Sequence, residues 1–220
     1  MAEHFEILDC LGISQQKTML RSEVHQCGAW HHASHVHLIN LSRQSIFIQK
    51  RCATKDVCPN MLDVVVGGHH DPGEPEQDAA NREVREEIGV DLLTYPGERI
   101  LIKGYKIGIN EYPAQNVQDH ELRDVTFFLS ELRLSDFVLQ REEVFGVLEF
   151  AVNDILDLFM DRVETIRNIE GACFDAEGKM VPFVESWRAN DFVPSADNYF
   201  GKVAFYSKLI FQGERAFPGI

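Results

Sequence analysis

The alternation of apolar and polar positions predicts a mixed β-sheet. Segments with period-2 alternation or many β-branched residues are typical of strands. They lie near His35–Asn40, Ser45–Lys50, Leu62–Val66, Arg99–Ile107, Val125–Ser130 and Phe145–Phe150. The predicted strands therefore all lie between residues 35 and 150.

Helical spacing of apolar residues predicts two helices, one between the third and fourth of these strands and one after the sixth. In Glu76–Ile88 four apolar side chains recur at helical spacing, and Gly89 is placed to cap the C-terminus. A second apolar stripe runs through Asn153–Arg167, with an Asn as its N-cap. Strands and helices together indicate the α/β class.

The C-terminal residues predict a hairpin followed by a helix. Gly171–Val184 has a turn sequence at Asp175–Gly178, and a helical segment lies around Tyr199–Phe211. We expect this extension to cover the sheet or to make a subunit contact, with shaping of the substrate pocket as the alternative. Since no repeat or linker interrupts the chain, residues 1–220 are predicted to form one domain, with a core of about residues 30–165 and an extension over 166–220.

Composition excludes several classes of protein. With 45% hydrophobic and 25% charged residues among 220, the chain is neither disordered nor fibrous. Its 35 acidic and 21 basic side chains give a net charge of −14, which disfavours nonspecific binding to nucleic acid. A phosphate-containing partner would need a divalent metal to offset this charge.

The sequence also predicts a cytoplasmic location. No apolar run is long enough to cross a bilayer, and the first residues lack the features of a signal peptide, so no membrane partner is expected. The five cysteines are odd in number and form no C-x-x-C pair, which favours reduced thiols over a disulfide framework or a zinc ribbon.

Three glutamates of the first predicted helix are the strongest candidates for chemistry. Glu83, Glu86 and Glu87 stand at positions i, i+3 and i+4, so their carboxylates share one helix face and repel each other. Carboxylate oxygens are the hard ligands that Mg²⁺ and Mn²⁺ prefer. The pattern indicates a metal site, and a solvated acidic face is the alternative.

The flanking residues favour the metal site. A buried strand leads to Gly68, and an Asp-Pro-Gly turn leads into the helix. Residues 68–90 fit G-x5-E-x7-R-E-U-x-E-E-x-G-U, the Nudix box, at every specified position, with U a bulky aliphatic residue. The chain thus resembles the Nudix hydrolases, which implies an α/β/α sandwich with a mixed sheet and hydrolysis of a nucleoside diphosphate linked to another moiety.

The resemblance also implies roles for the residues of the box. Glu83, Glu86 and Glu87 would bind the divalent metal, and the carbonyl of Gly68 would add a ligand. Glu74 would orient Arg82 through an ion pair; these two residues and Glu86 are placed among the catalytic group. Metal bridging a diphosphate would offset its charge, orient it and generate a hydroxide-like water.

Further similarities point to one branch of the superfamily. Residues 25–31, 49–51, 55–56, 59 and 62–63 resemble isopentenyl-diphosphate isomerases and the hydrolases nearest them, over roughly residues 1 to 160. Those isomerases carry a proton-transferring cysteine before the Gly-His pair, where this chain has Gly67. The missing thiol and the complete box favour hydrolysis over isomerisation.

The same branch suggests a second metal site. His31 and His69 match metal-binding positions of the isomerases, and His25 lies one residue away from a third. Imidazole is a good ligand for Zn²⁺ or Mn²⁺, and ordinary hydrogen bonding is the alternative. Glu121 matches a carboxylate that serves the active site in this branch, where it would be a metal ligand or a general base; an exposed loop glutamate is the alternative.

Other residues are weaker candidates. Lys50 and Arg51 are cations available to bind phosphate, and surface placement is the alternative. Trp30 and Tyr112 are candidate platforms for a nucleobase, against ordinary packing. Glu142 and Glu143 would either interact with the metal ligands without contacting the metal or be solvated.

We therefore predict a Mg²⁺- or Mn²⁺-dependent hydrolase of a small diphosphate substrate. An isomerase-like enzyme and a nucleotide-sensing module without turnover are the alternatives. The sequence leaves open the substrate, the number of metal ions, the general base and a homodimeric state.

Overall fold

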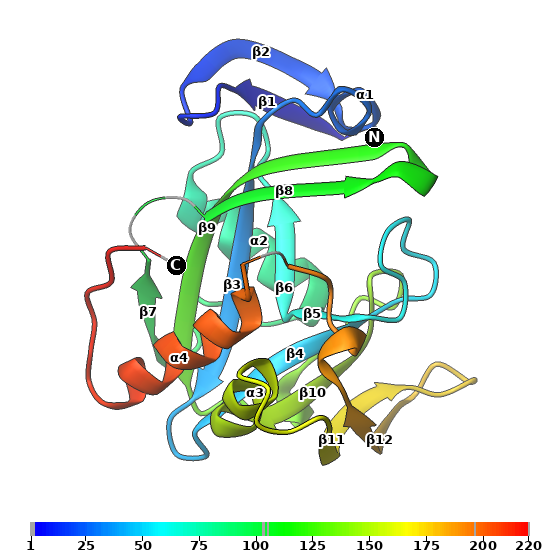
Figure 1. The fold of residues 1–220 in the computed structure, drawn as a ribbon, viewed down its shortest axis with the longest axis vertical. Coiled ribbons are helices and arrows are strands. Elements are labelled where there is room, and N and C mark those ends of the chain that lie inside the picture. Colours follow the sequence, from blue (N-terminus) through cyan, green and yellow to red (C-terminus); the bar gives the residue numbers. More distant parts are fainter. Residues whose placement is uncertain (1–2, 103, 105, 196, 220) are drawn as a thin grey trace.

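A large mixed sheet forms the centre of the molecule. The computed structural model describes residues 3–102, 104, 106–195 and 197–219. The path of the sheet runs β12-β11-β10-β4-β3-β9-β7, with β5 paired to β4, β6 to β3 and β8 to β9 (Figure 1). These strands are β3 (His31–Asn40), β4 (Ser45–Arg51), β5 (Leu62–Val64), β6 (Val66–His69), β7 (Gly97–Leu101), β8 (Lys106–Tyr112), β9 (Val117–Ser130), β10 (Val144–Ala151), β11 (Ile166–Phe174) and β12 (Met180–Trp187).

Helices cover both faces of this sheet, so the predicted α/β/α sandwich is confirmed. On one face, Ala80, Val84 and Ile88 of α2 (Glu76–Ile88) pack against sheet residues such as Val36 and Phe128. A separate apolar cluster joins the other face to α3 (Val152–Phe159) and α4 (Tyr199–Phe211). In Figure 1, α3 and α4 lie in front of the sheet and α2 behind it.

The parallel pair β3 and β9 positions two of the candidate residues. His31 stands opposite Glu121, and the register continues to Asn40 opposite Ser130. Because side chains alternate between the two faces of a sheet, the odd-numbered residues of both strands near this end face the same side.

An N-terminal unit was not predicted from the sequence. β1 (His4–Leu8) and β2 (Ser14–Leu20) form a two-stranded sheet, followed by α1 (Arg21–Cys27). Phe5, Ile7 and Val24 make a small apolar core in this unit. These elements are short and mostly polar, so their periodicity is weak, and their packing against the rest of the chain stabilises them.

Several predicted boundaries were wrong. The predicted strand Leu62–Val66 is two strands with different partners, β5 and β6, and Arg99–Ile107 is likewise divided between β7 and β8. The helix expected over Asn153–Arg167 runs from Val152 to Phe159, and Ala151, not Asn153, is its N-cap.

The early end of α3 has a structural reason. Asp161 has a positive φ of 55°, which ends the helical path, and Ile166 begins β11. Ile166 of this strand therefore extended the apparent helical stripe. In contrast, α2 and its αL cap at Gly89, the hairpin of β11 and β12, and α4 agree with the predictions.

Candidate active site and metal centre

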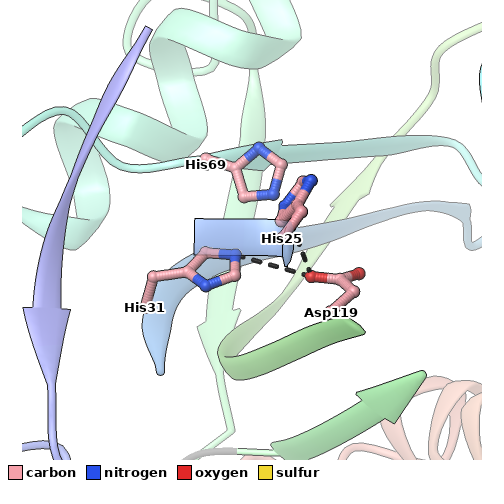
Figure 2. A group of neighbouring side chains, drawn as sticks. All are labelled: His25, His31, His69 and Asp119. Atoms are coloured by element: carbon pink, nitrogen blue, oxygen red, sulfur yellow. Dashed lines mark ion pairs between the residues drawn. The ribbon is translucent and has the colours of Figure 1, made fainter. Parts of the chain in front are cut away.

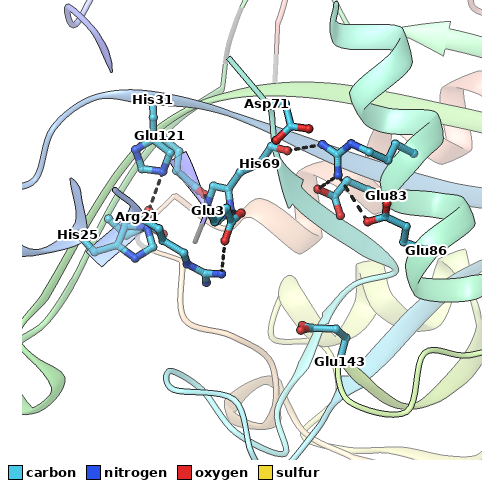
Figure 3. A network of polar contacts seen from close by, with 12 residues as sticks. Glu3, Arg21, His25, His31, His69, Asp71, Glu83, Glu86, Glu121 and Glu143 are labelled. Carbon is cyan, nitrogen blue, oxygen red and sulfur yellow. Dashed lines mark hydrogen bonds and ion pairs between the residues drawn. The ribbon is translucent and has the colours of Figure 1, made fainter. Parts of the chain in front are cut away.

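The helix α2 presents the three box carboxylates at the edge of a cleft. Its apolar face packs on the sheet, which leaves Glu83 and Glu86 on the side that faces His69 at the end of β6 (Figure 3). Glu83, Glu86 and Glu87 all line this cleft together with Gly68 and Glu143, and it is called the outer cleft below. The structure therefore brings together the predicted metal ligands.

Gly68 and Glu83 are in close contact. A Cβ atom at Gly68 would lie 2.0 Å from Glu83 Cδ, which is far inside van der Waals contact. Only glycine therefore lets the Glu83 carboxylate lie against the backbone of β6, where the Gly68 carbonyl was predicted to assist in metal binding.

Arg82 joins the box loop to the helix. Its Nε and Nη2 donate to the two carboxylate oxygens of Glu74 at 3.0 and 2.7 Å, and Nη2 also donates to the His69 carbonyl at 2.8 Å. Its Nη1 lies 2.8 Å from Glu83 Oε1 and 3.6 Å from Glu86 Oε2. The predicted contact between Glu74 and Arg82 is present, and two of the three acidic groups share the same guanidinium.

Burial disfavours the ionised forms of two of the three carboxylates, those of Glu83 and Glu87. Burial, with a further contribution from Glu83, raises the pKa of Glu87 to about 8. Burial also raises the pKa of Glu83 in spite of the Arg82 guanidinium. The exposed Glu86 lies at the rim, with 57% of its side chain accessible. A divalent cation among these oxygens would stabilise their ionised forms.

A second cluster lies across His69 from these glutamates. His25 from α1, His31 from β3, His69 from β6 and Asp119 from β9 each offer one ligand atom, and the four atoms lie within 4.8 Å of one another (Figure 2). His25 Nε2 and His31 Nε2 lie 3.7 and 3.5 Å from Asp119 Oδ1. The three predicted histidines are therefore brought together, with an aspartate that sequence reasoning did not assign.

The charge state of this cluster suits metal binding. Burial and the neighbouring His69 lower the pKa of His25 to about 4 and that of His31 to about 3. Burial and Glu121 raise the pKa of Asp119 to about 7. Imidazoles that are neutral at pH 7 keep a nitrogen lone pair for a metal ion.

Neighbouring side chains hold the histidine rings in place. Phe5 stacks on His31 and His69 with ring centroids 4.8 and 4.4 Å apart. His69 Nε2 lies 3.3 Å from Glu121 Oε1, and Arg123 Nε donates to Glu121 Oε2 at 2.5 Å. Against the effect of burial, Arg123 and His69 hold the pKa of Glu121 well below its ordinary value.

The predicted phosphate-binding cations lie in different places. Lys50 Nζ lies 3.3 Å from Glu185 and over the Phe145 and Trp187 rings, so it is not brought together with the carboxylates. Arg51 lines a second cavity next to the outer cleft, which is called the inner cavity below. Its guanidinium contacts the Asp63 carboxylate at 2.7 Å.

Two further cations are better placed than Lys50, and one of the two predicted aromatic residues is better placed than the other. Arg21 and Lys55 line both the inner cavity and the outer cleft, and Lys55 is paired with Glu143. Tyr112 lines the inner cavity, whereas Trp30 packs on His120 with ring centroids 5.2 Å apart.

One sequence signal could have identified the residues that were missed. Asp119 and Arg123, which were missed, alternate with the predicted Glu121 along β9, and all three line the inner cavity. The predicted strand began only at Val125, so this polar alternation was not recognised as part of it. A strand with polar residues on one face has a weak hydrophobic signature.

Comparison with known proteins gives concordant matches. The NUDIX domain family model matches residues 30–168. A Nudix hydrolase of Clostridium acetobutylicum is 29% identical over 182 residues, which span 82% of this chain and 85% of the relative. Nudix hydrolase 3 of Arabidopsis thaliana is 32% identical over 145 residues, which span 66% of this chain but only 19% of that protein.

A solved structure shares the fold. A protein of Deinococcus radiodurans superimposes with a TM-score of 0.56 at 20% identity, covering 72% of this chain and 90% of that chain. Within the part of the chain that the structure describes, no helix combines the length and apolarity needed to cross a bilayer.

Proposed function

Because the chain belongs to the NUDIX domain family and is a Nudix hydrolase, we propose that it cleaves a diphosphate linkage with the help of Mg²⁺ or Mn²⁺. The proposed substrate class is a nucleoside diphosphate derivative or a related small metabolite. The observation that carries this proposal is the convergence of Glu83, Glu86 and Glu87 with Gly68 on one cleft, where burial raises the pKa of Glu87 to about 8.

The residues of the box have distinct proposed roles. Glu83, Glu86 and Glu87 would hold the metal, assisted by the Gly68 carbonyl, and the bound ion would supply charge neutralisation and an activated water. Glu74 fixes the Arg82 guanidinium by a two-pronged contact, and Arg82 in turn supports the box loop at the His69 carbonyl. Arg82 and Glu74 would therefore act by positioning the carboxylates.

We propose that the outer cleft and the adjoining inner cavity bind different parts of the substrate. The outer cleft holds the acidic groups, and Arg21 and Lys55 stand where it meets the inner cavity. We assign the diphosphate to this junction, where these cations would contact its oxygens. The inner cavity would take the group attached to the diphosphate.

The C-terminal extension contributes to the proposed binding site. Val193, Pro194, Tyr199 and Phe200 line the inner cavity together with residues of the Nudix core. We propose that the extension shapes the pocket in addition to packing on the sheet. Specificity for the attached group would depend on these residues.

The histidine cluster is proposed as a second metal site. Its three imidazoles and Asp119 provide the nitrogen and oxygen donors that Zn²⁺ and Mn²⁺ accept. Glu121 remains in its two proposed roles, metal ligand or base. Its low pKa favours the first, because a general base acts best when its pKa is near the working pH.

The histidine cluster is also relevant to the isomerase-like alternative. The resemblance to isopentenyl-diphosphate isomerases extends to the histidines, and Gly67 lines the inner cavity where those enzymes carry a cysteine. Glycine has no side-chain thiol that could transfer a proton, so hydrolysis remains the proposed reaction. Assays of prenyl diphosphates for both isomers and hydrolysis products would separate the two activities.

The proposed function is tested with Glu86→Gln in the full chain. Glu86 lies at the accessible rim, so the variant should fold normally, as judged by circular dichroism. For each diphosphate that the wild-type protein hydrolyses, we expect turnover by the variant to fall at least about 10²-fold with saturating Mg²⁺ or Mn²⁺, because a carboxylate ligand is lost.

Asp78→Asn is the matched control, since Asp78 is exposed on the same helix outside the outer cleft. Substrates are first found by screening nucleoside, sugar, dinucleotide and prenyl diphosphates with product identification by mass. Unchanged turnover in folded Glu86→Gln would contradict the proposal, and metal-dependent ligand binding without any product would favour a sensing module.

A further inference from the structure

A separate cluster of two histidines and an aspartate lies outside the proposed active site. His32 Nδ1 and His70 Nε2 each lie 3.8 Å from the same oxygen, Oδ2 of Asp124. The two imidazole rings are nearly parallel, with centroids 5.2 Å apart and an angle of 12° between their planes. One ligand atom from each of the three residues lies within 4.8 Å of the other two.

The cluster faces the opposite side of the sheet from the inner cavity. His31, Ala33 and His35 of β3 face the histidine cluster or that cavity, so His32 between them faces the layer that contains α2. Asp124 follows Arg123 on β9 in the same alternation. The backbone N–H of His70 donates to the His32 carbonyl at 3.3 Å, which holds the two histidines side by side.

The three side chains are largely buried but remain partly accessible to solvent. The exposed fractions are 20% for the His32 side chain, 7% for His70 and 10% for Asp124. They come from β3, from β9 and from the first residue after β6. A bound ion would therefore join two central strands to the beginning of the box loop.

An ordinary ion pair does not account for the arrangement. His32 Nδ1 and His70 Nε2 lie 3.8 Å from Asp124 Oδ2, which is too long for a good hydrogen bond to the carboxylate. The same spacing lets both nitrogens and the oxygen contact one ion placed between them.

We propose that His32 Nδ1, His70 Nε2 and Asp124 Oδ2 bind one Zn²⁺ ion. Two neutral imidazoles and one carboxylate are a ligand set that Zn²⁺ accepts, with water in the fourth position. The bound ion would stabilise the junction of β3, β9 and the box loop. It is independent of the carboxylates of α2 and of the cluster around His25.

Ser34 supplies a matched control. Its hydroxyl lies 2.8 Å from His70 Nε2, the same atom that would bind the ion. Metal binding would replace this hydrogen bond, so Ser34→Ala should retain Zn²⁺ affinity. In a purely hydrogen-bonded cluster, Ser34→Ala and Asp124→Asn would both leave Zn²⁺ uptake unchanged.

The test uses the full chain carrying His31→Gln and Asp119→Asn, which removes ligands of the other cluster. With excess Mg²⁺ to occupy the box carboxylates, the apoprotein is titrated with Zn²⁺ and its metal content is measured after dialysis. We expect one Zn²⁺ per chain, a higher melting temperature on binding, and an affinity at least about 10²-fold lower after Asp124→Asn or His70→Gln.

Co²⁺ provides a readout that does not depend on substituting the site. In the same background, Co²⁺ should give the intense visible absorption of a four-coordinate ion, and Zn²⁺ should displace it. Absence of Zn²⁺ binding in this background would overturn the proposal. So would unchanged affinity in folded Asp124→Asn and His70→Gln proteins.

Discussion

Gly68 illustrates how one missing side chain can set the geometry of a site. The carboxylate of Glu83 occupies the space that a Cβ atom would need, and the same carboxylate contacts Arg82. A larger residue would have to displace Glu83 from the cleft. The glycine is therefore required by packing and not by its backbone flexibility.

We predict that Gly68→Ala lowers kcat at least about tenfold, because a misplacement of about 1 Å in a reacting group is enough to slow catalysis strongly. Gly73→Ala is the control: its Cβ would meet nothing within 4 Å, and its positive φ of 77° adds only about 1 kcal/mol of strain. Steady-state kinetics and thermal melting of both variants check the prediction. Equal kcat values for the two variants would contradict it.

At the scale of elements, α4 is part of the central core although it belongs to the C-terminal extension. Phe200 is buried and packs against Phe159 of α3 and against Phe192, with ring centroids 5.6 and 5.0 Å apart. On the same helix, Phe205 is half exposed. The helix therefore has one face that stabilises the fold and one that contributes little.

We predict that Phe200→Ala lowers the free energy of unfolding by about 3 kcal/mol or more, because it opens a cavity in an aromatic cluster. Phe205→Ala should lower it by less than about 1 kcal/mol. Urea unfolding followed by circular dichroism measures both. The importance assigned to α4 would be wrong if the two variants had the same stability.

At the scale of the whole molecule, buried histidines link stability to pH. His37 Nε2 and His35 Nδ1 each lie 3.0 Å from the Tyr199 hydroxyl, which joins β3 to α4. Burial lowers the pKa of His37 from 6.5 to about 3. The unfolded chain thus binds a proton that the folded chain does not, and stability falls as the pH decreases from 6.5 towards 3.

We predict that His37→Gln makes this decline shallower by about 2 kcal/mol between pH 7.5 and pH 5, since each pKa unit corresponds to about 1.4 kcal/mol. Tyr199→Phe, which removes the hydrogen bond but keeps the imidazole, should retain the wild-type slope. Urea unfolding at a series of pH values tests this. Equal slopes for wild type and His37→Gln would exclude the proposed contribution.

Local features of the fold were predictable, while strand partners were not. The bounds of α2 and its cap at Gly89 depend on residues within a few positions of each other, so the pattern sufficed. The division of Leu62–Val66 into β5 and β6 depends on pairing with two different strands. No local periodicity records which strand lies alongside.

The same distinction applies to the candidate site. The sequence alone determined the carboxylate face of α2, because the spacing of Glu83, Glu86 and Glu87 fixes their positions on a helix. Only the tertiary structure brought Asp119 to the histidines and turned Lys50 away from the cleft. Those positions follow from the pairing of β3 with β9 and of β4 with β10, contacts between residues far apart in the chain that chain-wide packing selects.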